Sequence, residues 1–485
     1  MQNIFILQSY FERYRSLIFL IGFFFIGLMV GYIIHSDHLV IFVNLLAVCL
    51  YFAISKNIRI SLLLLAGLFP LAFGDLGPVE EFLWVEWMAP LFLVTVLYSV
   101  ITEQSRFVFR GANIFIIALA ILVLAAIINY IKNPVTSHEL FGAGEGASGI
   151  RSYYTIFIGV LLFFIAYWLL LNDYVNFHVL FGVLILVALA AGILRVFSYF
   201  LEFDTPLLYS EFHYAPPPTE YGGSIAHRIG GLDRVTRIGL PAVIAFYHNR
   251  RWNMGAVLLV VAFFILMFLG GGRSIFLGVV FAAAVYFVLL HKQRIGFLLI
   301  LAGLIFVIYL AASAFLPVPD QFNRIFAYQG GIIQQSLPRG FLFKFYIDSF
   351  LSSPIMGKGI GFTEVGVHGD YLSQFVTTNL MIGGHGAYLS IISIFGLCGA
   401  FNLVVFLFGG ILYHLRFLKN ASPALQRYQD LSLFILLSLL IKTATYVVGW
   451  SGFNDLALYL FAGLTAALFT KSRLEQEPTI EREAD

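Results

Sequence analysis

Three short stretches between residues 227 and 401 combine arginine or histidine with glycine. They read HRIGGLDRVTRIGLPA at 227–242, LGGGRSIFLG at 269–278 and GGHGAYLSIISIFGLCGAF at 383–401. The planar guanidinium of arginine presents a fork of N–H donors that matches a phosphate group, and glycine lets the backbone approach a ligand closely. The combination therefore indicates binding of a phosphate or pyrophosphate, with a histidine available as a base.

The first stretch carries Arg228, Arg234 and Arg237. If a helix begins here, Arg234 and Arg237 share one face, because residues three apart are neighbours on a helix surface. We expect Arg237 to contact the phosphate group, with Arg228 and Arg234 in support. The alternative is a basic turn beside the membrane that pairs with Glu220, with Asp233 or with lipid headgroups.

The second stretch places Arg273 beside Ser274 at the expected start of a helix. The free N–H groups and the positive dipole at a helix start form a ready site for a phosphate, and an arginine there adds further donors. We expect Arg273 to be a principal phosphate ligand. The alternative is a glycine hairpin whose arginine extends to the membrane surface.

The third stretch follows a segment, 339–362, that we expect to form an amphipathic helix ending at a glycine-rich turn. His385 stands between Gly384 and Gly386 at the expected mouth of a membrane span. A neutral imidazole in this place could take a proton from an attacking sugar hydroxyl. His368 competes for the same role, and a loop histidine that caps a helix is the alternative for either residue.

The composition predicts that most of the chain lies in lipid. Hydrophobic residues make up 60% of the 485 positions, charged residues 11%, and the mean hydropathy is +0.92. We expect an all-α, polytopic transmembrane helical bundle of about 12–14 spans, forming a single integral membrane domain over 1–485. The expected spans are 16–34, 38–54, 59–75, 86–102, 112–131, 153–172, 176–199, 235–249, 254–270, 274–291, 296–315, 386–413, 429–450 and 453–470. The span 235–249 contains Arg237 and Pro241, which predicts a broken or half-buried helix.

The arginines and lysines predict the orientation. With a cytoplasmic N-terminus, nearly every short inside loop carries a cation, as the positive-inside rule requires. The loops 200–234 and 316–385 then face outward, the second being large and partly helical, and the polar tail 472–485 is cytoplasmic and disordered. Many of the remaining cations gather in or beside the two outward loops, where the rule disfavours them. We therefore expect a ligand to be bound on that face, while Lys442 is left within a span.

At these residues the chain resembles the O-antigen ligase and O-antigen (exopolysaccharide) polymerase superfamily of bacterial membrane glycosyltransferases. SSPIMGKGIGF at 352–362, followed by HGAYLSIISIFGLCG at 385–399, is similar to that family's P-x-x-G-x-G turn and its H-N-x-Y-L start of a helix ending in G-L-x-G. The segment 270–278 resembles its S-x-R-G/S turn, and 227–242 its arginine-glycine stretch. Gly386 stands where the family usually has asparagine.

The resemblance implies a GT-C-like fold and an inverting, metal-independent glycosyl transfer without a cofactor. The site would face the periplasm from the bacterial inner (cytoplasmic) membrane. The donor would be an undecaprenyl-pyrophosphate-linked oligosaccharide and the acceptor a glycan or a lipid. The implied roles are pyrophosphate binding for Arg273 and Arg237 with Arg228 and Arg234 in support, catalytic base for His385, and acceptor or loop contacts for His368, Arg339 and Tyr388.

Polymerisation of polysaccharide repeat units is the favoured activity, because the chain carries two sizeable outer loops. Ligation of the glycan to lipid A-core or to protein would use the same residues, and a lipid-linked glycan flippase or transporter is a further alternative. Membrane lipids and a chain-length regulator are the other expected partners. The net charge of +2 and the absence of a basic tail give no indication of nucleic-acid binding.

Overall fold

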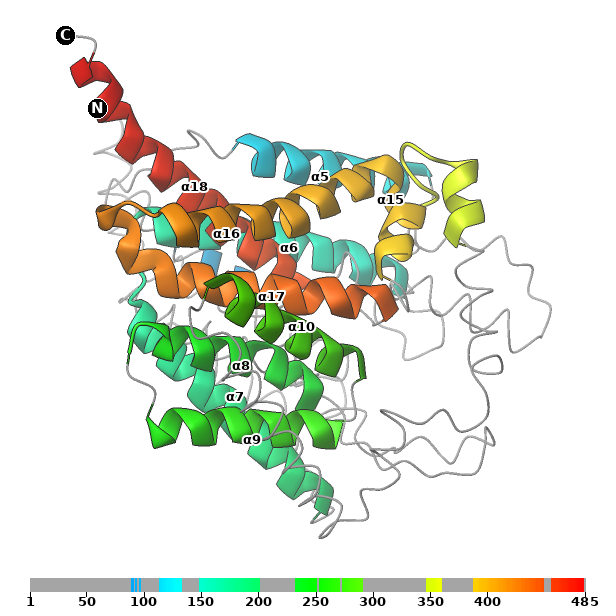
Figure 1. The fold of residues 1–485 in the computed structure, drawn as a ribbon. Helices are drawn as coiled ribbons and strands as arrows, with labels where there is room; N and C mark the ends of the chain where they lie inside the picture. The colour runs from blue at the N-terminus through cyan, green and yellow to red at the C-terminus, as the bar shows by residue number, and fades with distance from the viewer. Residues whose placement is uncertain are drawn as a thin grey trace, which may run out of the picture.

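The computed structural model describes residues 89–90, 92–93, 96, 113–132, 148–200, 232–250, 253–270, 273–290, 346–359, 387–448 and 455–483. Its elements are α5 (Asn113–Lys132), α6 (Ser148–Leu171), α7 (Phe177–Phe200), α8 (Leu232–His248), α9 (Met254–Gly270), α10 (Arg273–Leu290), α15 (Ala387–Leu403), η4 (Val404–Gly409), α16 (Gly410–Asn420), η5 (Pro423–Tyr428), α17 (Gln429–Val448) and α18 (Leu456–Glu483). Within these ranges the protein is all-helical, and the helices lie side by side in a bundle (Figure 1). The expected spans 16–34, 38–54, 59–75 and 296–315 lie outside the described residues.

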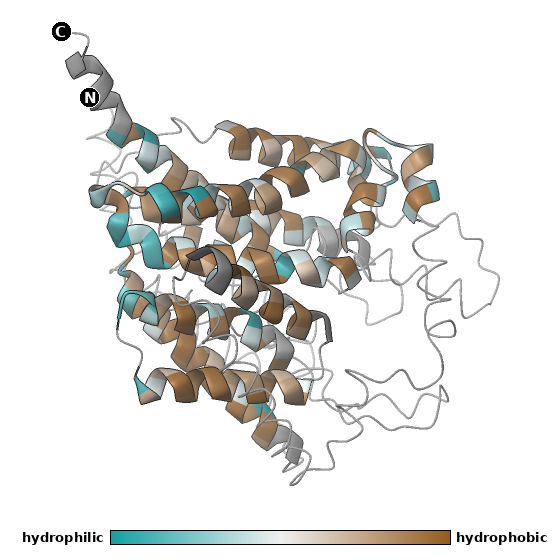
Figure 2. Cartoon of the chain, in the orientation of Figure 1, coloured by the Kyte–Doolittle hydropathy of each residue, from teal (hydrophilic) through white to brown (hydrophobic). Residues whose placement is uncertain are grey.

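Five helical stretches of the described chain are long and apolar enough to cross a membrane. They are Ile114–Lys132, Tyr153–Leu171, Phe177–Phe197, Ala387–Asn420 and Pro423–Val447. The helices are apolar along most of their length, while hydrophilic residues gather towards the ends (Figure 2). Several helices also expose large apolar side chains, as surfaces in contact with lipid do, such as Ile131 on α5 and Leu186 on α7. This confirms the multi-pass helical architecture in the part of the chain that is described.

Helix α17 lies at the centre of this bundle and packs against α8, α10 and α16. Close backbone contacts at glycines allow this packing. A Cβ atom at Gly278 of α10 would lie 2.8 Å from the carbonyl oxygen of Ile441, and one at Gly239 of α8 would overlap the ring of Phe263 in α9. Any larger residue at Gly278 would push α10 away from the centre of α17, because the neighbouring atom belongs to the backbone.

Helix α8 corrects the prediction of a broken helix at 235–249. It is continuous from Leu232 to His248 with Pro241 inside it. Proline has no N–H, so Pro241 cannot donate the usual helical hydrogen bond to the carbonyl of Arg237. In the turn before, the hydroxyl of Thr236 adds a hydrogen bond to the carbonyl of Leu232 at 2.9 Å. The packing of α8 between α7, α9 and α17 keeps the segment helical.

The expected span 386–413 is not one regular helix. The regular helical backbone is interrupted at Gly396, where φ is 59° and ψ is −144°, and the helix resumes through η4 and α16. The turn at 353–359 docks into this break. Lys358 N and Gly359 N donate to the carbonyls of Ser393 and Ile394 at 3.0 Å each.

The same break is closed from its other side. Leu397 N donates to the Pro354 carbonyl at 2.8 Å, and the Asn129 amide of α5 donates to the carbonyls of Met356 and Ile394 at 3.0 and 3.1 Å. The broken backbone is therefore satisfied by protein groups, as irregular backbone inside a membrane protein must be. Hydrogen bonds therefore join the glycine-rich turn, α15 and α5 to one another.

At one end of the bundle, ionic contacts join the connections between helices. Asp173, in the turn after α6, accepts hydrogen bonds from Lys471 of α18 at 2.8 Å, from Arg427 of η5 at 3.2 Å and from the Tyr428 hydroxyl. Burial raises the pKa of Asp173, but the hydrogen bonds from Lys471 and Tyr428 and the charges of Lys471 and Arg427 together lower it below its ordinary value. Arg250, at the end of α8, lies at this end too and contacts His178 at 3.0 Å. With a cytoplasmic N-terminus, Arg250, Arg427 and Lys471 follow the expected spans 235–249, 386–413 and 453–470 on the side predicted to be cytoplasmic.

The C-terminal helix extends further than the sequence analysis predicted. A span ending near 470 and a disordered tail at 472–485 were expected, whereas α18 is helical through Glu483. The residues after Lys471 include Leu474, Glu475 and further glutamate, glutamine and arginine, which are good helix formers, and the helix also contains Pro478, which lacks an N–H. Helix α18 therefore continues beyond its apolar part, although the residues after Lys471 are hydrophilic.

Candidate functional site

A buried ion pair lies towards the other end of the bundle. Lys442 of α17 donates to a carboxylate oxygen of Asp455, which directly precedes α18. The exposed fractions of the two side chains are 6% and 4%. The hydroxyl of Tyr446, one turn after Lys442, donates to the same oxygen at 2.6 Å. A charged pair this deeply buried in an apolar bundle is a marker of function, because desolvation of the ions is unfavourable.

Asp455 also determines where α18 begins. Its second carboxylate oxygen accepts from the backbone N–H of Ala457 at 3.1 Å, and its carbonyl accepts from Leu458 N at 2.9 Å. This is an N-cap, in which a side-chain oxygen satisfies a free N–H of the first helical turn and the negative charge faces the positive end of the helix dipole. One carboxylate thus holds the start of α18 and two donors of α17 together.

Arg237 of α8 lies within electrostatic range of Lys442, Tyr446 and Asp455. Its Nε atom is buried and has no hydrogen-bond partner among the described residues. Asp455 therefore neutralises one of two cations, and among the described side chains of the cluster one positive charge remains in excess. A buried N–H donor of a guanidinium that lacks an acceptor is suited to an anionic ligand.

Residues of all three motif stretches contact or interact electrostatically with a single part of α17. Arg237 represents the first stretch, and Gly278 of the second stretch packs on the backbone of Ile441, one residue before Lys442. The hydroxyl of Tyr388, from the third stretch, donates to the carbonyl of Thr443 at 3.0 Å. We call Arg237, Tyr388, Lys442, Tyr446 and Asp455 the basic cluster.

Aromatic rings form one wall of the basic cluster. The ring of Tyr388 lies edge-to-face with that of Tyr446 at a centroid distance of 5.8 Å and stacks on Phe408 at 6.2 Å. Lys442 Nζ lies 6.0 Å from the centroid of the Phe461 ring. These rings fix the hydroxyl of Tyr446 on Asp455 and exclude water from the ion pair, which strengthens its electrostatic interactions.

The structure describes only some of the predicted site residues. Arg237 and Tyr388 are described with their side chains, and both belong to the basic cluster. Arg234 lies in the first turn of α8 and Arg273 is the first residue of α10, so the backbone of each is placed but the side chain is not described. Arg228, Arg339, His368 and His385 lie outside the described residues.

The roles of Asp455, Tyr446 and Lys442 were not predicted from the sequence. A usable signal was present. Lys442 is the only cation in the expected span 429–450, and Asp455 is the only charged residue in the next expected span, 453–470. Two antiparallel spans with a short connection bring such residues together near the connected ends, and a charged residue within lipid requires a partner.

Neither a protein-family model nor a curated protein matches this chain. The similarity to O-antigen ligases and polymerases therefore remains a resemblance in short motifs. Across the described part of the chain, no three His, Cys, Asp or Glu side chains gather in a way that could hold a metal ion.

Proposed function

We propose that the chain is a membrane glycosyltransferase that takes an oligosaccharide from undecaprenyl pyrophosphate on the periplasmic side of a bacterial inner membrane. Its favoured activity is the polymerisation of polysaccharide repeat units. The observation that supports this most strongly is the excess positive charge of the basic cluster, with the buried, unpartnered Nε of Arg237, at the place where all three motif stretches meet.

The proposed reaction needs a base and a leaving-group site. The oxygen of an acceptor hydroxyl attacks the anomeric carbon of the donor sugar, and the bond from that carbon to the pyrophosphate oxygen breaks. The electron pair stays on the pyrophosphate, and the hydroxyl proton passes to the base, for which His385 is the candidate. Inversion at the anomeric carbon follows from a single displacement.

In this mechanism Arg237 stabilises the charge that develops on the leaving pyrophosphate. A donor placed in a site without water acts more strongly than the same donor in solution, because little reorganisation is needed during the reaction. Arg273 begins α10, whose Gly278 packs against the α17 backbone beside Lys442, so the start of α10 can supply further N–H donors. Lys442 remains paired with Asp455 and contributes to the potential of the site.

An assay with purified protein and a lipid-pyrophosphate-linked repeat tests this function. Replacement of Arg237 by alanine should lower the transfer rate at least tenfold, since a charge-assisted hydrogen bond contributes roughly 1.5–3 kcal/mol. Arg237→Lys should recover only part of the rate, because an ammonium group cannot form the bidentate contact. Arg416→Lys, on the exposed surface of α16, is the matched control and should retain full rate. Equal rates for Arg237→Ala and the wild type would contradict the assignment.

The acceptor separates polymerisation from ligation. Deletion of the gene should leave cells with single repeats attached to their final acceptor if the chain polymerises. Full-length polymer that remains on the carrier lipid would instead identify a ligase that acts on lipid A-core or protein. If the reconstituted protein moves a lipid-linked glycan across a bilayer and forms no glycosidic bond, it is a flippase and neither a polymerase nor a ligase.

A further inference from the structure

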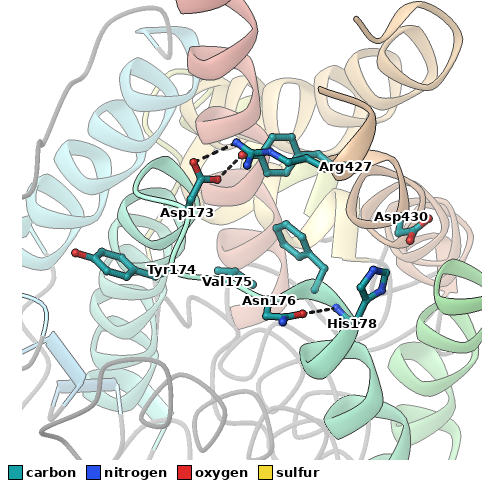
Figure 3. Close-up of a pocket in the computed structure, with 9 residues that line it drawn as sticks. Asp173, Tyr174, Val175, Asn176, His178, Arg427 and Asp430 are labelled. Atoms are coloured by element: carbon teal, nitrogen blue, oxygen red, sulfur yellow. Dashed lines mark hydrogen bonds and ion pairs between the residues drawn. The ribbon is translucent and has the colours of Figure 1, made fainter. Parts of the chain in front are cut away.

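A pocket of about 350 Å³ lies at the end of the bundle opposite the basic cluster. Its walls are the turn between α6 and α7, the first residues of α7, and the junction of η5 with α17. Figure 3 shows Asp173 and Arg427 facing each other on one side of this pocket, with His178 and Asp430 on the other. Asp430 and Tyr446 belong to the same helix, sixteen residues apart, so the two sites are separated by roughly 24 Å along α17.

Both carboxylates of the pocket already have donors. Asp173 accepts from Arg427, Tyr428 and Lys471, and Asp430 accepts from the Asn249 amide at 2.7 Å. Asp173 is paired with two cations, Arg427 and Lys471, so it offers little attraction to a cationic ligand. The pocket chemistry does not favour a cation.

The basic groups at the pocket retain capacity for a ligand. The side chain of Arg427 is 62% exposed and uses one terminal nitrogen on Asp173, which leaves other donors of its fork directed to solvent. Arg250 contacts His178 and lies over the Phe246 ring at 4.1 Å. Arg427 lines the pocket, while Arg250 and Lys471 lie beside its lining residues His178 and Asp173, which gives three permanent cations in or next to the pocket against two carboxylates. This balance favours an anion, and arginine forks favour a phosphate.

An apolar surface continues from the pocket along α7. Val179 follows directly after His178, and Val179, Leu186 and Ile193 recur every seven residues on one side of the helix, with exposed fractions of 44, 67 and 43%. Phe177 and Tyr428 form an aromatic floor in the pocket, with ring centroids 5.8 Å apart. This order matches the parts of a phospholipid in a membrane. The charged groups would face the headgroup, the aromatic rings the interface, and the exposed apolar stripe the acyl chains.

We propose that this pocket binds the phosphate headgroup of an anionic phospholipid, whose acyl chains lie along the exposed apolar stripe of α7. The lipid would come from the leaflet predicted to be cytoplasmic. Arg427 and Arg250 bind the phosphate, while Asp173, which also pairs with Lys471, holds Arg427 in place. A bound lipid would link the α6–α7 turn, η5 and the end of α8, and so stabilise the bundle at a distance from the basic cluster.

Native mass spectrometry of the full-length protein in detergent, titrated with phosphatidylglycerol or phosphatidylcholine, tests this proposal. Wild-type protein should bind phosphatidylglycerol more tightly than phosphatidylcholine. Arg427→Gln should weaken phosphatidylglycerol binding about tenfold through loss of a charge-assisted contact. Lys419→Gln removes an exposed cation at the same end of the bundle, outside the pocket, and should bind like the wild type.

A second arm distinguishes a lipid from free phosphate. Inorganic phosphate and the deacylated headgroup glycerophosphoglycerol should bind much more weakly than the lipid, because they lack acyl chains for the α7 stripe. Equal binding of the headgroup and the lipid, equal binding of the two lipids, or no effect of Arg427→Gln would overturn the proposal. Arg250→Gln, which leaves Asp173 intact, should also weaken binding and replaces Arg427→Gln if that variant fails to fold. Lipid binding is independent of catalysis, so an inactive enzyme would not affect this test.

Discussion

Asp455→Ala should lower the free energy of unfolding by about 3–5 kcal/mol, the range for removal of one partner from a buried ion pair. The structure explains this size. Lys442 and the hydroxyl of Tyr446 both donate to one oxygen of Asp455, and the N–H of Ala457 donates to the other. The alanine variant leaves the ammonium of Lys442 buried with an exposed fraction of only 6% and without its carboxylate. Arg237, a second cation in the same cluster, then adds uncompensated repulsion.

The double variant Lys442→Met/Asp455→Ala separates the charge from the other effects. Methionine is close to lysine in shape and carries no charge, so the double variant should be destabilised by only about 1–3 kcal/mol, the effect of an unsatisfied Tyr446 hydroxyl and of the lost N-cap bond to Ala457. The recovery relative to Asp455→Ala should therefore be about 2 kcal/mol, measurable by equilibrium unfolding in mixed micelles.

A control variant accompanies this comparison of the single and double variants, and one result would contradict its reasoning. Lys419→Met, at an exposed position of α16, should leave the free energy of unfolding unchanged within about 0.5 kcal/mol. If Asp455→Ala and the double variant are equally unstable, the uncompensated charge of Lys442 is not the cause, and the account of the ion pair fails.

Three further predictions follow from other parts of the bundle. Gly396→Ala should destabilise the protein by at least about 1–3 kcal/mol, because a Cβ there would lie 2.5 Å from the carbonyl oxygens of the docked turn and φ is +59°. The control is Gly182→Ala in α7, where an added Cβ would have nothing within 4 Å. This variant should be neutral or stabilising by up to about 1 kcal/mol in the same unfolding assay. The pKa of Asp173 is lowered in the folded protein, so its charge should stabilise the fold fully above the unfolded pKa of about 3.9 and lose this contribution as the pH falls through the lower folded value. The free energy of unfolding, measured from about pH 6 down to about pH 3, should therefore fall less for Asp173→Asn than for the wild type. Equal pH profiles for the two proteins would refute this. His414→Ala should cost about 1–3 kcal/mol or more, since the fully buried imidazole contacts two hydroxyl groups at 2.9 Å, and a wild-type melting profile would contradict that role.

Much of the helix pattern could be predicted from hydropathy. The expected spans 176–199, 254–270 and 274–291 agree with α7, α9 and α10 to within one residue at each end. This accuracy has a physical reason. In lipid, a continuous run of apolar residues must form a helix that satisfies its own backbone groups, and its polar flanks determine where the run ends.

The errors occurred where tertiary contacts replaced local rules. The break at Gly396 is possible because the turn 353–359 supplies hydrogen-bond partners from a distant part of the sequence. Glycine at this position was visible in the sequence, but the docked turn was not. At Pro241 the error was the opposite one: a break was expected, but neighbouring helices keep α8 continuous despite the missing N–H.

Lys442 shows how the candidate site extends beyond motif analysis. The motif stretches were selected because arginine, histidine and glycine occur close together in the sequence, and this criterion cannot find a residue whose partners lie on other helices. In the structure, α17 residues 441–446 contact or interact with residues of all three stretches, and Lys442 holds the start of α18 through Asp455. If the proposed pyrophosphate binds Arg237, the potential at that site depends on whether Lys442 is neutralised. Asp455 would then influence ligand affinity without touching the ligand, because one carboxylate determines both the fold of the α17–α18 connection and the charge that the basic cluster presents.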